Sequence, residues 1–356
     1  MTLGRSLKIT TMIPTQDIPG LLSAVARGAD SAFHLSREAA RALFAKWLSG
    51  QLPSTAQGAL WIAFRLKGET LPELLGFVAA TEGCLATIKA PAGPKPVVLP
   101  SYNGARRHAN LLPLLALLLA REGVPVLIHG SYGGPAEETA LALPQHDPSA
   151  RTSTGEILAH LGYPPVITHH ALHDHLQRHR LAYVPLDVLH LRLASMLSLR
   201  RVLGVRSSAH TVIKLFNPFK TSVMQCAAVT HPAYLDRMRA FFMAAGSTAL
   251  VFRGAEGEPV AHARRRPALI GIDAGYEHEW FREDRSPLTH ITELPDECNA
   301  ATTCVFIGEI LAGHRAIPEP IRDQAACLLV MSGAVPDLAS ACAKLNVSSK
   351  RVGQRS

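Results

Sequence analysis

Short runs of positive charge are the feature of this sequence best suited to chemistry. A guanidinium group can hold a phosphate through two parallel hydrogen bonds, and an ammonium group attracts it as a point charge. We therefore take these runs as candidate phosphate-binding positions. The candidates are Arg106, Arg107, Arg200, Arg201, Arg206, Lys214, Lys220, Arg264, Arg265 and Arg266.

Each run also has a structural interpretation, and the sequence leaves both open. Arg264–Arg266 is the densest cluster of positive charge, but clusters of this kind are usually solvated. One of the three arginines between 200 and 206 would serve equally well in an ion pair with a helix carboxylate. Lys214 lies in the apolar segment 212–216, so its ammonium group is expected to reach a surface or a groove.

Two other groups of side chains have the spacing of metal ligands. Glu256 and Glu258 would share a face of an extended segment, although a solvated turn is the favoured interpretation. His169 and His173 would lie one turn apart on a helix, which suits zinc. The favoured interpretation of the histidines between 169 and 179 is that they add positive charge as the pH falls. We therefore predict no metal site and no cofactor.

Composition is typical of a globular protein from a reducing compartment. Of the 356 residues, 47% are hydrophobic and 18% are charged, which favours a large buried core over disorder. No apolar run reaches the roughly 18 residues of a membrane span, and no signal peptide is recognisable. The six cysteines include no Cys-x-x-Cys pair, which argues against a disulfide framework. We expect a cytoplasmic protein that has no membrane partner.

Charge is segregated along the chain, whose formal net charge is +8. Residues 196–270 contain eleven Lys and Arg residues against three acidic ones, whereas residues 271–323 contain eleven acidic residues against four arginines. A segregated basic segment is the electrostatic pattern expected of a protein that binds a polyanion. A surface on which the charges are spread evenly is the alternative that composition leaves open.

The elements that must position these side chains begin with helices. Residues 1–16 are expected to form a flexible arm, and residues 17–90 a small helical bundle. A later helical segment near 185–203 is a candidate to join this bundle. Ser36 is a good N-cap, and Thr70 begins a capping box with the glutamate three residues later.

Short apolar runs alternate with helical patterns in the rest of the chain. This alternation predicts a larger α/β domain with a mostly parallel sheet over residues 91–345. Residues 124–129 and 248–252 are predicted strands, and residues 103–121 form a predicted helix that would place two arginines at its N-terminus. Residues 346–356 are expected to be a basic tail.

The order and spacing of several short motifs resemble the anthranilate phosphoribosyltransferase family. The resemblance covers roughly residues 20–345 and implies a helical bundle followed by a nucleoside phosphorylase- and phosphoribosyltransferase-like α/β domain. It rests on Leu35-Ser36-Arg37-Glu38-Ala39, the stretch from Gln57 to Thr70, His129-Gly130, the stretch from Leu199 to Arg206, and Asn217-Pro218.

The sequence departs from the family pattern at the positions that the enzymes use for chemistry. The enzymes carry a Gly-Thr-Gly-Gly-Asp loop whose backbone N–H groups hold diphosphate. The matching stretch here is Ser101-Tyr102-Asn103-Gly104-Ala105-Arg106-Arg107. Ile128 replaces a phosphate-facing lysine, and the stretch from Gly254 to Pro259 lacks the adjacent Asp-Glu pair that holds magnesium. The resemblance therefore implies that no catalytic residue is retained.

The Tyr-Asn-Gly-Ala-Arg and Glu-Gly-Glu-Pro stretches are similar to the YbiB-type branch of this family. That resemblance implies a homodimer formed through the helical domain, and binding of DNA, with RNA as a second candidate, in basic grooves without sequence specificity. Asn103, Gly104, His129 and Asn217 join the basic candidates as implied phosphate-binding positions. Two alternatives stay open: a transferase or phosphorylase with a remodelled site, and a scaffold that only dimerises and binds proteins.

Overall fold

The computed structural model describes residues 17–27, 32–86, 88–131, 151–288 and 291–348. It divides into two compact units. One is formed by residues up to 85 together with 190–218, and the other by 86–189 together with the residues from 219 onward. The expected arm at residues 1–16 and most of the expected basic tail lie outside the described residues.

The smaller unit consists of helices. Ser36 Oγ accepts the N–H of Ala39 and so confirms the predicted N-cap, and the predicted capping box at Thr70 is also present. The rings of Phe44 and Phe77 stack at 4.7 Å in the core of this unit. Its helices are α1 (Ile18–Val25), α2 (Arg37–Leu48), α3 (Ser54–Lys67), α4 (Leu71–Gly83), α9 (Arg200–Leu203) and α10 (Ala209–Val212).

Helix α8 (Leu186–Ser198) crosses the boundary between the two units. His190, the first residue after the boundary, has non-helical backbone angles of φ −157° and ψ 81°. The helical segment predicted near 185–203 is therefore present but interrupted, by the kink at His190 and by the break between the end of α8 at Ser198 and the start of α9 at Arg200.

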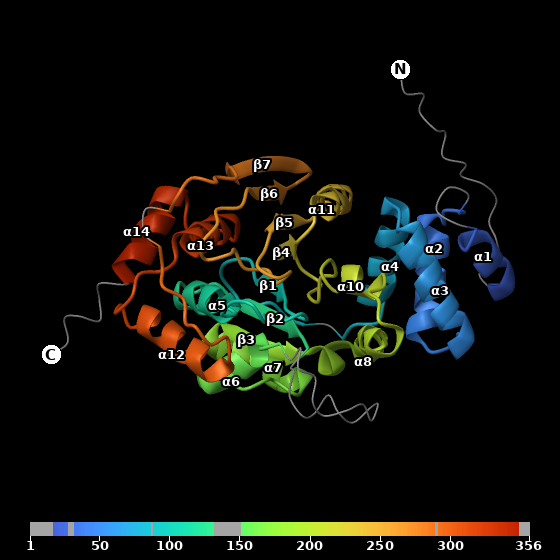
Figure 1. Cartoon of the computed structure of the whole chain (residues 1–356), viewed down its shortest axis with the longest axis horizontal. Coiled ribbons are helices and arrows are strands. Elements are labelled where there is room, and N and C mark those ends of the chain that lie inside the picture. The colour runs from blue at the N-terminus through green and yellow to red at the C-terminus, as the bar shows by residue number, and fades with distance from the viewer. Residues whose placement is uncertain (1–16, 28–31, 87, 132–150, 289–290, 349–356) are drawn as a thin grey trace, which may run out of the picture. The chain divides into compact units, whose positions relative to one another are not determined.

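The larger unit contains one seven-stranded sheet (Figure 1). Its strand order is β3-β2-β1-β4-β5-β6-β7, in which the first five strands pair in parallel and the last two in antiparallel fashion. The prediction of a mostly parallel sheet is thereby confirmed. The strands are β1 (Val97–Pro100), β2 (Val126–Gly130), β3 (Leu181–Pro185), β4 (Met224–Val229), β5 (Thr248–Arg253), β6 (Leu269–Asp273) and β7 (Tyr276–Phe281).

Helices cover the parallel strands, whose residues are buried almost throughout because both faces of the sheet are packed. Alternate strand residues such as Val97 and Leu99 join the main core with leucines of α5. No helix in the described ranges combines the length and the hydropathy needed to span a bilayer. The helices of this unit are α5 (Leu112–Arg121), α6 (Thr154–His160), α7 (His169–His179), α11 (Pro232–Ala245), α12 (Ala300–Leu311), α13 (Glu319–Met331) and α14 (Leu338–Ser348).

The helix predicted over residues 103–121 is wrong in its first half. Residues 101–110 form a loop, and α5 begins only at Leu112, with Pro113 in its first turn. Gly104 has a φ of +63°, and the neighbouring backbone N–H groups donate to side chains far along the sequence instead of to helix carbonyls. Residues 346–348 of the expected tail are also helical, as the end of α14.

Candidate anion-binding site

The loop that follows β1 is held by two glutamates from the turn after β5. Glu258 is buried, and its carboxylate accepts the backbone N–H groups of Asn103 at 2.8 Å and Gly104 at 2.9 Å. It also accepts the hydroxyl of Ser101, which bonds in turn to Thr154 at 2.7 Å. Neutral donors thus surround a buried carboxylate, which is what an anion taken out of water requires.

Glu256 occupies the next part of the same loop. Its carboxylate accepts the backbone N–H of Arg107 at 2.8 Å and that of Arg106 at 3.1 Å, and it pairs with Arg151 at 3.0 Å. Burial raises the pKa of this carboxyl, but the backbone N–H groups and the Arg151 guanidinium outweigh burial and lower the pKa overall. Glu256 is therefore charged at neutral pH.

The backbone conformations of the turn after β5 and of the loop after β1 allow these hydrogen bonds. Glu256 has a φ of +51° and Gly257 a φ of +89°, so the chain turns sharply between the two carboxylates. On the other side, Gly104 lies so close to Thr152 that a Cβ would stand 2.8 Å from the Thr152 carbonyl oxygen. A loop whose successive N–H groups point to one side is a general anion-binding device in proteins.

These contacts correct the interpretation of Glu256 and Glu258 as a solvated turn. Glu258 has 1% of its surface exposed, and the carboxylate oxygens of both residues accept backbone or side-chain donors. Each of the two carboxylates is held by several N–H or O–H donors of the loop after β1. Within the residues that the structure describes, no group of three or more His, Cys, Asp or Glu side chains is placed to hold a metal ion.

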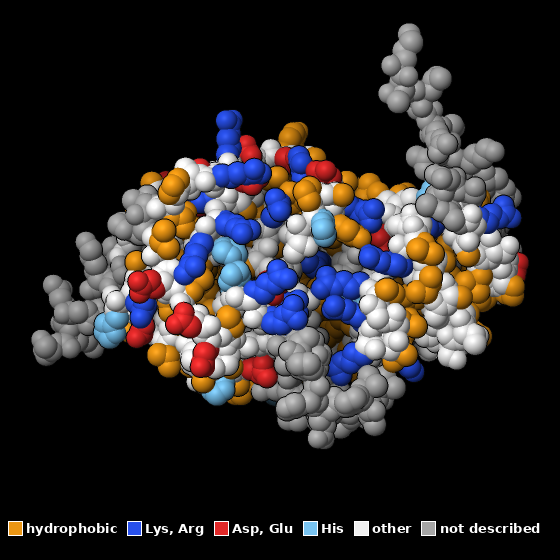
Figure 2. Space-filling model, viewed as in Figure 1, with side chains coloured by type: hydrophobic (Ala, Val, Ile, Leu, Met, Phe, Trp, Pro, Cys, Tyr) orange, Lys and Arg blue, Asp and Glu red, His pale blue; other side chains and the backbone are white. Residues whose placement is uncertain are grey.

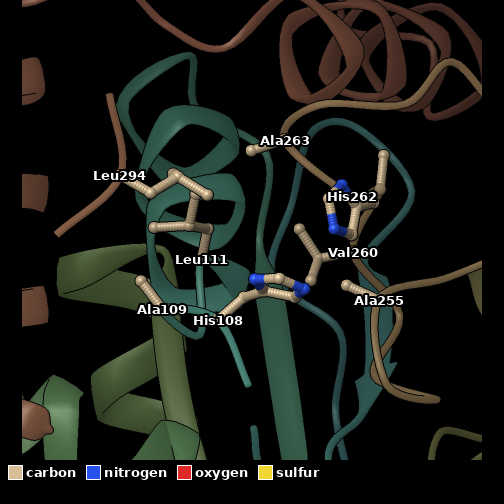
Figure 3. A pocket seen from close by; sticks show the side chains of 9 residues that line it. His108, Ala109, Leu111, Ala255, Val260, His262, Ala263 and Leu294 are labelled. Carbon is tan, nitrogen blue, oxygen red and sulfur yellow. The ribbon is translucent and has the colours of Figure 1, made fainter. Parts of the chain in front are cut away.

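An exposed basic rim lies beside the loop, made by Arg106, Arg107, Arg264 and Arg265. Two histidines connect its parts, since the rings of His108 and His262 meet edge to face at 4.7 Å (Figure 3). Leu111 and Leu294 complete a small pocket around them. Burial, His108 and the two neighbouring arginines lower the pKa of His262 to about 4. We define the basic rim as Arg106, Arg107, Arg264 and Arg265.

Lys and Arg side chains are frequent on the face of the larger unit that Figure 2 shows, and acidic ones gather over a separate area near α12. Arg266 does not belong to the basic rim, although it follows Arg265. Its guanidinium lies 2.9 Å from Asp284 and 2.9 Å from Glu319, and its side chain is 17% exposed. The candidate run Arg264–Arg266 therefore contains two exposed arginines and one that is held in ion pairs.

His129 is also not available to a ligand as a cation. It is fully buried on β2, and burial lowers its pKa to about 3, so its ring is neutral at physiological pH. A neutral ring cannot attract phosphate by its charge, and the implied phosphate-binding role of His129 stays a prediction.

The remaining candidates are divided between the two units. Arg200 and Arg201 are exposed on α9, and Arg206 is half-buried. Lys214 is 9% exposed, so it does not lie on an open surface, and the expectation that its ammonium group reaches a groove stays a prediction. The backbone N–H of Asn217 donates to Glu82 at 2.7 Å. Lys220 is exposed but belongs to the larger unit.

Some residues of the site were not found by sequence reasoning. Arg151 and Thr154 lie about 50 residues from the loop that they support, and no motif marks them. His262 lies three residues after the Glu-Gly-Glu-Pro stretch and two before the arginine run, so its position alone was a usable signal. The histidines on α7 form a ring contact between His175 and His179, whose centroids are 5.4 Å apart.

Comparisons with known proteins show which family this chain resembles. The model of the glycosyl transferase family, helical bundle domain, matches residues 20–81. YbiB of Escherichia coli (strain K12) is 34% identical over 332 residues, which cover 93% of this chain and 99% of YbiB. The anthranilate phosphoribosyltransferase of Desulfitobacterium hafniense (strain Y51) is 30% identical over 230 residues, or 64% of this chain and 63% of that enzyme.

Solved structures share the fold at lower sequence identity. Anthranilate phosphoribosyltransferase from Thermus thermophilus has a TM-score of 0.67 at 18% identity, over 94% of this chain and 97% of that one. The Saccharomyces cerevisiae enzyme in complex with PRPP and Mg has a TM-score of 0.69 at 11% identity, over 95% and 94% of the two chains. The chain therefore belongs to the anthranilate phosphoribosyltransferase-like family, in which YbiB is a relative over almost its whole length.

Proposed function

We propose that this protein binds nucleic acid with low sequence specificity on a phosphoribosyltransferase-like scaffold. The observation that carries the proposal is the orientation of charge around the loop after β1. The carboxylates of Glu256 and Glu258 turn inward onto backbone N–H groups, while Arg106, Arg107, Arg264 and Arg265 are exposed. The outer surface of the loop is therefore basic although the segment after β5 contains two acids.

Exposed arginines of this kind suit the phosphates of a polynucleotide. A guanidinium binds phosphate by direct hydrogen bonds and releases the counterions that surround the strand. Phosphate contacts position a protein on nucleic acid but carry no sequence information, so the expected specificity is low. The exposed Arg200, Arg201 and Lys220 are further candidates for such contacts.

The main alternative is a transferase or phosphorylase with a remodelled site. Transfer of a phosphoribosyl group needs positive charge, usually from a metal ion, on the departing diphosphate. Here the carboxylates that would hold the metal accept N–H groups, and the loop donors that would hold diphosphate point at Glu256 and Glu258. These contacts favour binding over catalysis.

The deciding experiment is an electrophoretic mobility shift with single-stranded DNA, double-stranded DNA and RNA at two salt concentrations. We expect binding to all unrelated sequences with similar affinity, and a logarithmic affinity that falls linearly with the logarithm of salt concentration. Binding without any salt dependence would overturn the proposal and favour the remodelled enzyme. The nucleic acid that binds most tightly in this assay also shows whether DNA or RNA is preferred.

We further propose that the protein self-associates through its helical unit. Ile62 and Leu66, on one face of α3, are 39% and 70% exposed, and Leu191 and Val202 are 64% and 58% exposed. Exposed apolar side chains of this size favour a protein partner, and the family resemblance suggests a second copy of the same chain. Light scattering of the wild type should give a dimer mass, and Leu66→Glu should shift it toward the monomer.

A further inference from the structure

Helix α7 carries two histidines one turn apart whose rings lie close together. His175 and His179 are four residues apart near the end of α7, so their side chains project from the same side of the helix. Their ring centroids are 5.4 Å apart, and the ring planes are tilted by 56°. His175 is half-buried and His179 is exposed, so ions in solution can reach both rings. The pair therefore has the spacing of a chelating site for a metal ion.

The distance between the two rings fits zinc. A zinc ion bound to one nitrogen of each ring at about 2.1 Å would lie roughly 3.2 Å from each ring centroid. With the centroids 5.4 Å apart, the two bonds would then enclose an angle of about 110° at the ion. This angle is close to that of the tetrahedral coordination that zinc prefers, and imidazole nitrogen is one of its usual ligands.

The helix holds the pair in place and favours a cation there. Leu172 and Leu176 are buried on the side of α7 that packs against β3, which fixes the orientation of the helix. His179 is the last residue of α7, and positive charge near the C-terminus of a helix is stabilised by the helix dipole. Among the described residues, neither imidazole makes a hydrogen bond or an ion pair that a metal ion would have to break.

The pair that spacing alone suggests, His169 and His173, differs in its surroundings. His169 is exposed, but Nδ1 of His173 is buried and has no hydrogen-bond partner among the described residues. The ring of His173 therefore turns part of its edge to the interior. His169 serves instead as a matched control, because it is an exposed histidine on the same helix.

We propose that His175 and His179 form a binding site for Zn²⁺ in which the two imidazoles supply two ligands. Within the described part of the chain, no third His, Cys, Asp or Glu side chain is placed to complete the coordination, so water or an external ligand takes the remaining positions. The site departs from the sequence-based expectation of no metal. It goes beyond the proposed function, because binding of zinc needs no nucleic acid.

The test is calorimetric titration of the full chain, freed of metal by a chelator, with zinc chloride. The chain has 17 histidines, so the comparison between variants identifies the site and total zinc uptake does not. His175→Ala and His179→Ala should each weaken the binding of one zinc ion by at least about tenfold, because a single imidazole lacks the gain from chelation. His169→Ala should bind zinc like the wild type.

Two outcomes would overturn the inference. One is unchanged zinc binding in His175→Ala or in His179→Ala; the other is an equal loss in His169→Ala, which would mean general binding to surface histidines. Alanine favours a helix, so the variants are expected to fold, and circular dichroism checks this. If an alanine variant loses helix, the corresponding glutamine variant provides the same comparison.

Anomalous scattering from a zinc-soaked crystal gives a second, direct measurement. A zinc peak between the rings of His175 and His179 supports the site, whereas zinc peaks only elsewhere would contradict it. The mobility shift with nucleic acid is measured in the presence of a chelator, so failure of the nucleic-acid proposal is distinguishable from failure of this one.

Discussion

At the scale of single residues, the arginine run after β5 shows that identical neighbours differ in their surroundings. Arg266 is held between Asp284 and Glu319, each 2.9 Å away, whereas Arg264 and Arg265 are exposed. Only the exposed pair can reach a polyanion without giving up an existing ion pair. This difference makes Arg266 a matched internal control for the proposed binding.

The double variant Arg264→Ala/Arg265→Ala should weaken nucleic-acid binding to a similar extent for unrelated sequences. The slope of log K against log salt should flatten by roughly 0.9 for each phosphate of duplex DNA that the variant no longer binds, or about 0.7 on single strands. Arg266→Ala should leave this slope unchanged and reduce stability instead. Filter binding over a salt series measures the slope of each variant, and an unchanged slope in the double variant would mean that these arginines are surface charge only.

His129 predicts acid sensitivity of the larger unit. Its pKa is about 3 in the folded protein and, as an ordinary imidazole, about 6.5 in the unfolded chain. Between these values the unfolded chain binds a proton that the folded protein does not, so stability is lost as the pH falls from about 6.5 toward 3. The loss is at most about 1.4 kcal/mol per pH unit for this residue.

Denaturant unfolding at pH 7 and pH 5 checks this expectation. His129→Gln has no titrating ring at this position, so its difference in unfolding free energy between the two pH values should be smaller than that of the wild type. An identical difference in both proteins would show that His129 does not control the acid sensitivity.

At the scale of helices, α3 and α4 are joined by a buried ion pair. Lys67 Nζ lies 2.7 Å from Glu73 Oε2, and the side chains are 1% and 0% exposed. Glu73 also accepts the N–H of Thr70 at 2.9 Å as the capping box of α4, and the N–H of Leu35 at 2.8 Å. One carboxylate thus fixes the start of α4, the end of α3 and the segment before α2.

Glu73→Ala should destabilise the helical unit by about 3–5 kcal/mol, because it leaves the Lys67 ammonium buried without its partner. Arg41→Ala, on an exposed position of α2, should change stability by less than about 0.5 kcal/mol. Urea unfolding followed by circular dichroism measures both variants. A loss below about 1 kcal/mol for Glu73→Ala would contradict the role assigned to this pair.

At the scale of the whole molecule, charge segregation along the sequence is reduced by pairing in space. Glu277 pairs with Arg239 at 2.5 Å, and Asp284 and Glu319 pair with Arg266. Residues of the acidic segment thus neutralise part of the basic one. The net charges of the two segments therefore overstate the difference in charge that a ligand would meet between them.

The wild type is expected to form no phosphoribosyl anthranilate from phosphoribosyl diphosphate and anthranilate with magnesium. The reason is that the backbone N–H groups of the loop that would hold diphosphate donate to the carboxylates of Glu256 and Glu258. Anthranilate fluorescence gives a sensitive assay, and an authentic family enzyme is the positive control. Robust magnesium-dependent turnover would contradict this expectation and favour the alternative function, a transferase with a remodelled site.

The sequence by itself determined the fold class and several local features. Ser36 and Thr70 were identifiable as caps because capping depends on residues within one helical turn. The alternation of strands and helices predicted the mostly parallel sheet, because strand and helix periodicities are local properties of a sequence. The replaced glycines and acids in the two loops were also visible without a structure.

Only the tertiary structure decided which contacts the candidate residues make and how far they are buried. Glu256 and Glu258 meet the loop after β1 from about 150 residues away, and Arg151 joins them from a third segment. The same long-range packing buried His129 and Lys214 and paired Arg266 with two acids. Burial and pairing depend on which segments the sheet brings side by side, and residue type and spacing in a single chain do not specify those neighbours.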